Sequence, residues 1–142
     1  MNQERLAKII EDMQECIADI NECLDVLESR KDDALIIKLS KSSLRQLFVS
    51  FHTILEDFCS IVLKEIKKYR IGITLHESLT ILKESGVIKE DTYTFLEKSR
   101  LIRNRISHRY KEPRYEELLQ HILKYNNNFE DIVKISKFYV SK

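Results

Sequence analysis

Apolar residues recur every three or four positions along almost all of the 142-residue chain, which is the period of amphipathic helices. The first run of this kind, over residues 6–27, predicts a helix that ends near Ser29 in the polar stretch SRKDD. The second run, over residues 39–66, predicts a long helix that stops before Gly72. Because this second helix is apolar around much of its circumference, we expect it to be central and buried on more than one side.

Capping residues mark a short third helix. Thr74 and Glu77 have the spacing of a capping box, which predicts the start of this helix. Gly86 suits the left-handed position that follows a helix end, so we expect the third helix to finish there. A fourth helix is predicted from about Lys89 to Arg109, because apolar positions again follow the helical period.

The last helix is predicted to open at Pro113, since proline is well tolerated in a first helical turn. Asn126-Asn127-Asn128 interrupts its apolar stripe and is expected to kink or fray it. The chain has only two glycines and one proline, which leaves few residues suited to tight turns and sheet corners. We therefore predict an all-α fold, an up-and-down bundle of four to five helices including one short helix, in a single domain over residues 1–142.

Composition also excludes several classes of protein. No apolar run reaches about 18 residues, so we expect no membrane span, and the charged beginning MNQERLAK does not fit a signal peptide. Cys16, Cys23 and Cys59 show no CxxC spacing and are expected to be reduced core residues of a cytoplasmic protein. Without an HExxH motif or a Cys/His cluster, we expect no metal site, and we expect no cofactor.

Charge is unevenly distributed although the formal net charge is only +1. Residues 1–33 carry ten acidic and four basic side chains, whereas residues 98–114 carry seven Lys or Arg and a single acid, Glu112. A charge run alone is most often a solvated helix face. The basic run, however, includes the stretch RNRISHRY at residues 103–110, and a concentrated positive patch is what a polyanion would bind.

A helical wheel at about 100° per residue divides this stretch into separate lines. Arg103 and Tyr110 share one line beside the buried stripe of the fourth helix, and Asn104 and His108 share another. Arg103 and His108 then diverge by about 140° on a straight helix. A second copy of the chain across a two-fold axis is the arrangement we expect to unite these lines, and a helix that ends near His108 is the other option.

The pattern Arg103-Asn104-x3-His108-x-Tyr110 resembles the RX4HXY signature of HepT-type HEPN proteins. The preceding LKESGVIKEDTYTFLEKSRLI is similar to the short helix, glycine-containing turn and motif helix of that family. The resemblance implies a metal-independent endoribonuclease toxin, usually a homodimer, whose partner is an MNT-type nucleotidyltransferase antitoxin. It implies that Arg103 and His108 are the catalytic pair, that Asn104 supports them, and that Tyr110 is the site where the antitoxin attaches AMP.

The residue chemistry agrees with an RNA substrate. The imidazole of His108 can exchange protons near neutral pH, and Arg103 offers a planar set of donors that matches phosphate oxygens. The remaining cations of the stretch would hold the RNA backbone; they are Arg105, Arg109 and Lys111. An AMP group on Tyr110 would place bulk and negative charge where an RNA phosphate must lie. Partial packing of Tyr110 beside the core is equally compatible with its position.

Other functions stay open at this stage. A non-catalytic HEPN module that binds RNA or a nucleotide, or docks a nucleotidyltransferase, is the main alternative, and a purely structural bundle is the third. The second helix offers Glu56 and Asp57 as polar neighbours of the motif, but the pattern does not decide between them. The other histidines, His52, His76 and His121, are interpreted as packed or surface residues, and the remaining aromatic residues as core.

Overall fold

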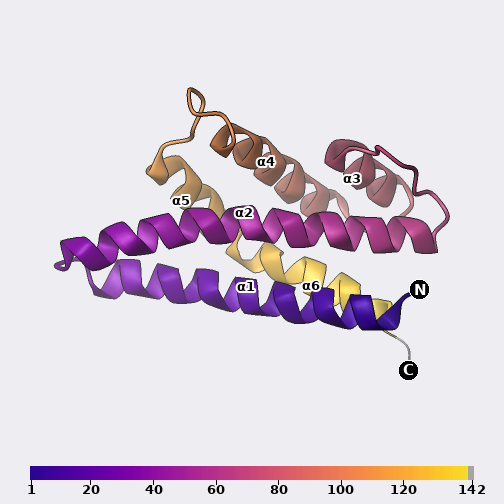
Figure 1. The fold of residues 1–142 in the computed structure, drawn as a ribbon, viewed down its shortest axis with the longest axis horizontal. Helices are drawn as coiled ribbons and strands as arrows, with labels where there is room; N and C mark the ends of the chain where they lie inside the picture. Colours follow the sequence, from indigo (N-terminus) through magenta and orange to yellow (C-terminus); the bar gives the residue numbers. More distant parts are fainter. Residues whose placement is uncertain (141–142) are drawn as a thin grey trace.

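A computed structural model describes residues 1–140 of the chain and shows helices joined by short segments (Figure 1). Within these residues there are six α-helices and one 3₁₀ turn, and no strand. The all-α prediction is therefore confirmed. The elements are α1 (Gln3–Ser29), α2 (Ala34–Glu65), α3 (Leu75–Glu84), α4 (Glu90–Ile106), α5 (Tyr115–Lys124), η1 (Asn126–Asn128) and α6 (Phe129–Phe138).

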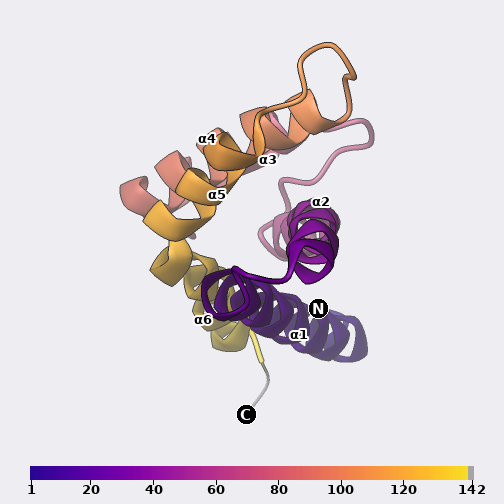
Figure 2. The same ribbon diagram turned by 90° about the vertical axis from the view of Figure 1, so that its left-hand side faces the viewer.

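The two long helices α1 and α2 lie antiparallel along their whole length (Figure 1). Each begins at a side-chain cap, because the carboxamide of Asn2 accepts from the Arg5 amide and the carboxylate of Asp33 accepts from the Ile36 amide. The first helix ends at Ser29, as the sequence predicts. The other helices lie on the remaining sides of this pair, with α3, α4 and α5 beyond α2, and α6 beside α1 (Figure 2).

Helix α2 is the central element of the bundle, as its broad apolar pattern predicts. Its buried side chains include Phe48, Phe51 and Phe58, and it packs against α1, α3 and α4. Among the described residues it is the one helix long and apolar enough to cross a membrane, with a mean hydropathy of 1.3 over its most apolar stretch. Half of that stretch is buried within the bundle. The core helix of a helical bundle can have the same length and hydropathy as a membrane-spanning helix.

Helix α3 has the predicted ends. The hydroxyl of Thr74 accepts from the Glu77 amide, and the Glu77 carboxylate accepts from the Thr74 amide, so the capping box is present. Beyond the last residue of α3, Gly86 has a φ of 76°, in the left-handed region that glycine adopts without strain.

Helix α4 ends earlier than the sequence pattern predicts, at Ile106 instead of Arg109. Its C-cap is Ser107, and a hydrogen bond of 3.1 Å from the His108 amide to the Arg105 carbonyl tightens the chain into a turn. Between Ile106 and Pro113, which is buried, the one large apolar side chain is that of Tyr110, and it is exposed and does not cover the core. The residues from Ser107 to Arg114 therefore form a loop that projects from the bundle (Figures 1 and 2).

The predicted last helix is divided into α5 and α6. Pro113 does not lie in the first turn, because Arg114 is still extended and serves as the N-cap of α5. The asparagine run forms the 3₁₀ turn η1, which accounts for the expected kink and raises the helix number above four to five. The side chain of Asn126 donates to Asn21 of α1 and that of Asn128 donates to Asp131, so polar contacts stabilise the break.

Candidate functional site

Arg103 lies in the last turn of α4, where the helix leaves the core. Its guanidinium donates to the hydroxyl of Ser107 at the helix end. The side chain is half-buried, and its Nε is a buried donor with no hydrogen-bond partner in the described part of the chain. Arg103 is therefore held by packing and by one exposed contact, which leaves most of its donors for a ligand.

A cavity of about 370 Å³ lies beside Arg103, among α2, α4 and the beginning of α3. Its lining includes His52 and Glu56 from α2, and Arg100, Arg103 and Asn104 from α4. The volume is in the range of small-ligand pockets. Of the three residues expected to act in catalysis, two line this cavity, Arg103 and Asn104.

The structure decides which acidic residue of α2 lies near the motif. Glu56 lines the cavity that contains Arg103. Asp57, one residue later, faces the other way and forms an ion pair of 3.6 Å with Arg5 of α1. The sequence pattern could not separate these two, because the register of α2 against α4 depends on packing between distant segments.

His108 and Tyr110 lie in the loop that follows α4. The His108 side chain is exposed, and its carbonyl accepts from the Lys111 amide at 2.9 Å, so the chain turns back on itself there. The side chain of Tyr110 is 99% exposed. Partial packing of Tyr110 against the core is therefore absent, and its hydroxyl is open to a modifying enzyme.

One hydrogen bond from Arg105 and one ion pair from Arg45 fasten the loop to the bundle, and a second ion pair joins the helices on either side of it. Arg105 donates to both carboxylate oxygens of Glu117 in α5, and its Nε donates at 3.0 Å to the Lys111 carbonyl. Arg45 of α2 pairs with Glu112 at 2.7 Å. Exposed pairs of this kind add little to global stability, but here they restrain where the loop lies.

Some cations of residues 98–114 form ion pairs and others do not. Arg105 is paired as described, and Arg100 donates to Glu97 at 2.9 Å. The loop cations Arg109, Lys111 and Arg114 form no ion pair within residues 1–140. The free positive charge is thus concentrated on the loop, beside the end of α4.

The wheel that separated Arg103 from His108 assumed a helix through residue 109, and this premise is wrong. Because α4 ends at Ile106, the direction of His108 is set by the turn and not by the helical period. No hydrogen bond joins Arg103 to His108 within the described chain. The helix end therefore removes the fixed divergence, while a second copy of the chain remains a proposal.

Two buried histidines lie near the site and differ in their hydrogen bonds. Burial lowers the pKa of His52 to about 4; the hydrogen bond to the Phe48 carbonyl opposes this effect, and the nearby Arg103 charge adds to it. Burial also lowers the pKa of His121 to about 4, together with Lys98 and Lys124. His121 Nε2 has a partner, the Ser99 hydroxyl at 2.7 Å, whereas His52 Nε2 has none.

A third histidine forms part of an exposed network at the rim of the cavity. His76 lies 2.8 Å from Glu97, which also accepts from Arg100. Burial raises the pKa of the Glu97 carboxyl, but the hydrogen bonds from Arg100 and His76 outweigh it and lower the pKa overall. Glu97 thereby neutralises much of the Arg100 charge, which leaves Arg103 as the main free cation of the cavity.

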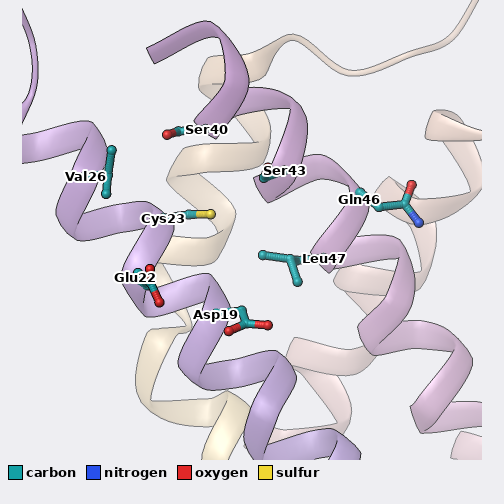
Figure 3. A pocket seen from close by; sticks show the side chains of 8 residues that line it. All are labelled: Asp19, Glu22, Cys23, Val26, Ser40, Ser43, Gln46 and Leu47. Atoms are coloured by element: carbon teal, nitrogen blue, oxygen red, sulfur yellow. The ribbon is translucent and has the colours of Figure 1, made fainter. Parts of the chain in front are cut away.

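A second surface cavity does not share this chemistry. A cavity of about 430 Å³ lies between α1 and α2 and is lined by Asp19, Glu22 and Cys23 from one helix and Ser40 from the other, among others (Figure 3). Its carboxylates would repel a phosphate, and it contains no cation. In the described part of the chain, no group of three or more His, Cys, Asp or Glu side chains is arranged so that it could hold a metal ion.

Comparisons with known proteins bear on the fold. No family model matches the chain, and no curated protein matches its sequence. The structure is similar to a chain in a crystal structure of a toxin–antitoxin with AMP-PNP, with a TM-score of 0.65 at 17% identity. The superposition covers 96% of this chain and 99% of that chain, so the two share an all-α bundle from end to end.

The buried histidines predict a pH dependence of stability. Both are neutral in the folded protein and regain an ordinary pKa near 6.5 on unfolding. The unfolded chain therefore binds more protons between pH 6.5 and pH 4, and stability is complete above pH 6.5 and is lost as pH falls toward 4. We expect the free energy of unfolding, measured with urea, to fall by roughly 1.4 kcal/mol per pH unit for each histidine in this window.

The contribution of one histidine can be isolated with His121→Phe, which keeps a ring against Phe95 but cannot be protonated. This variant should show a shallower decline than the wild type, whereas His76→Gln, at an exposed site, should leave the slope unchanged. A wild-type stability that stays constant from pH 7 to 4 would contradict the assignment of neutral buried histidines.

Proposed function

We propose that this protein is the toxin of a toxin–antitoxin pair and acts as a metal-independent endoribonuclease with Arg103 and His108 as its catalytic residues. The observation that carries the proposal is the end of α4, where a phosphate-matched arginine beside a cavity is followed at once by an exposed histidine on a cationic loop. The end-to-end similarity to a chain of a toxin–antitoxin structure supports the toxin–antitoxin context. The resemblance of the motif to HepT-type HEPN proteins supports the reaction.

Arg103 is suited to bind the phosphate at which RNA is cleaved. Only Ser107 engages its guanidinium, so at least one full edge of donors is available to two phosphate oxygens. Because it lies in a helix whose other side is packed in the core, its position is well defined. Asn104, which lines the same cavity, can donate its amide hydrogens to a further phosphate oxygen.

His108 is suited to move the proton that the reaction requires. As base, its imidazole takes the proton of a ribose 2′-hydroxyl, whose oxygen then forms a bond to phosphorus. The bond from phosphorus to the 5′-oxygen breaks, and that oxygen takes a proton from water or from the same histidine of a second copy. The charge on the phosphorane is stabilised by Arg103, and the products are a 2′,3′-cyclic phosphate and a 5′-hydroxyl.

The free cations of the loop are suited to hold the rest of the strand. Arg109 and Lys111 can contact the RNA backbone without giving up an ion pair, and such contacts are independent of sequence and sensitive to salt. Arg105 would act differently from a simple backbone contact, because its Nε donates to the Lys111 carbonyl of the loop while its other nitrogens pair with Glu117 of α5. A homodimer would place two such loops along one cleft and supply the second histidine.

The proposed partner is a nucleotidyltransferase antitoxin that attaches AMP to Tyr110. Full exposure of this phenol meets the steric requirement for modification by another enzyme. The similar structure was solved with AMP-PNP, an adenine nucleotide analogue, which is compatible with adenylyl transfer in that system. An AMP group two residues from His108 would repel an incoming RNA phosphate and block its path.

A second candidate function is a non-catalytic HEPN module that binds RNA or docks the nucleotidyltransferase. It is favoured by the absence of a contact between Arg103 and His108 in the described single chain. The two functions differ in one result, because this module would bind RNA and leave it intact.

Cleavage of RNA in the presence of EDTA tests the proposed activity. The wild type should cut RNA and leave 2′,3′-cyclic phosphate ends, because the attacking hydroxyl belongs to the substrate. Removing the proton-transfer group in His108→Ala should lower the rate by about 10²–10⁴-fold, and Arg103→Ala should lower it by about 10²–10³-fold. Lys134→Ala, which removes an exposed cation of α6, should cleave like the wild type.

Equal cleavage by all four proteins would point to a contaminating nuclease. Activity only with a divalent metal, or products with 3′-hydroxyl ends, would also overturn the mechanism. Binding without cleavage would favour the non-catalytic module.

Adenylylation of Tyr110 is tested by mass spectrometry after incubation with the proposed partner and ATP. The wild type should gain the mass of one or more AMP groups and lose activity, whereas Tyr110→Phe should remain unmodified and active. Tyr69→Phe, which changes a 40% exposed tyrosine outside the motif, should still be modified. Modification and silencing of Tyr110→Phe would show that another residue is the target.

A further inference from the structure

Two polar atoms lie buried at the cavity beside Arg103 and have no partner in the described residues, His52 Nε2 and Arg103 Nε. A buried donor or acceptor without a partner destabilises the folded protein, so such atoms are uncommon without a reason. His52 is 0% exposed, yet it lines the cavity, and the Arg103 charge is close enough to influence its pKa. The two orphan atoms therefore belong to one site.

The hydrogen bonds of His52 define what its free nitrogen can do. Nδ1 lies 2.9 Å from the carbonyl oxygen of Phe48, which can only accept, so Nδ1 carries the hydrogen. The ring is neutral at physiological pH, because burial lowers its pKa to about 4. Nε2 is consequently an acceptor with a free lone pair, and it requires a donor from the ligand.

The remaining lining narrows the kind of ligand. Arg103 and Asn104 offer donors, whereas His52 Nε2 and the Glu56 carboxylate accept. Inorganic phosphate at neutral pH mainly accepts hydrogen bonds, so it would leave His52 unsatisfied and would be repelled by Glu56. A hydroxyl can donate to one partner and accept from another, and a ribose carries such a group next to a phosphate.

We propose that His52 Nε2 accepts a hydrogen bond from a ribose 2′-hydroxyl of the bound strand, and that this cavity is where the protein distinguishes RNA from DNA. The proposal rests on the proposed function, which supplies RNA as the ligand. His52 acts in binding and not in proton transfer, since a neutral imidazole with so low a pKa is a weak base. Because His52 is 0% exposed, the proposal requires the end of the Arg103 side chain to turn from Ser107 toward the phosphate and so expose Nε2.

Oligonucleotides that differ only at the 2′ position test this directly. Binding is measured with the full chain carrying His108→Ala, so that the RNA is not cleaved. The ligands are one sequence as RNA, as 2′-deoxy and as 2′-fluoro, because fluorine cannot donate a hydrogen bond. RNA should bind about five- to tenfold tighter than the 2′-fluoro strand, which is the effect of one hydrogen bond.

Variants at the two buried histidines show whether His52 is responsible. His52→Phe keeps an aromatic ring next to Phe48 and Phe51 but lacks the acceptor, so it should bind RNA and the 2′-fluoro strand equally. His52→Gln, which can place an amide oxygen near the position of Nε2, should restore part of the preference. His121→Phe is the matched control, because this histidine is also buried but does not line the cavity, and it should keep the full preference.

A measurement on an unchanged His52 covers the case in which these variants fail to fold. The ¹⁵N resonance of His52 Nε2 should shift when RNA is added to the His108→Ala protein, and it should not shift with the 2′-fluoro strand. A resonance that stays in place, or equal binding of all three strands, would overturn the proposal and indicate that a buried water fills the site.

The test of His52 and the test of the proposed nuclease can fail independently of each other. RNA cleavage that depends on Arg103 and His108 but shows no effect of His52 on 2′ discrimination would refute this inference alone. Discrimination that depends on His52 without any cleavage by the wild type would refute the nuclease and retain the RNA site.

Discussion

The position of α4 against α2 depends on a cluster of three aromatic rings in the core. Phe51 of α2, Phe95 of α4 and Phe129 of α6 meet with centroid distances of 4.8 Å between Phe51 and Phe129 and 4.9 Å between Phe95 and Phe129. All three are fully buried or nearly so, and such clusters combine a large hydrophobic gain with a defined geometry. They fix α4 against α2, and thereby bring Arg103, two turns beyond Phe95, to the cavity that His52 lines.

The functional groups begin where this core ends. Arg103 retains the rigidity of a packed helix, while His108 and Tyr110 lie on a loop that no apolar residue draws into the bundle until Pro113. A hydrogen bond from Arg105 to the Lys111 carbonyl and an ion pair from Arg45 to Glu112 restrain that loop without burying it. In the proposed function, a rigid phosphate-binding group would lie beside an exposed but tethered proton-transfer group, an arrangement suited to a substrate as large as RNA, and Tyr110 would stay accessible to a regulating enzyme.

Much of the fold follows from local rules in the sequence. The helical period located α1 and α2, and the capping box and Gly86 located α3, because these features depend on neighbours within one turn. The end of α4 was predicted three residues too late, since polar residues with helical spacing do not reveal where the core stops supporting a helix. Motif spacing identified Arg103, Asn104, His108 and Tyr110 as candidates. It could not identify His52 or choose Glu56 over Asp57, because those assignments require the packing of α2 against α4.

RNA is proposed to bind at the end of α4, across the cavity and the loop. A structure of the His108→Ala protein with uncleaved RNA tests it most directly. We expect a phosphate on the Arg103 guanidinium and a ribose hydroxyl at His52 Nε2. The RNA backbone should continue past Arg109 and Lys111. A strand bound elsewhere, such as along the α1–α2 face that contains the acidic cavity, would contradict it.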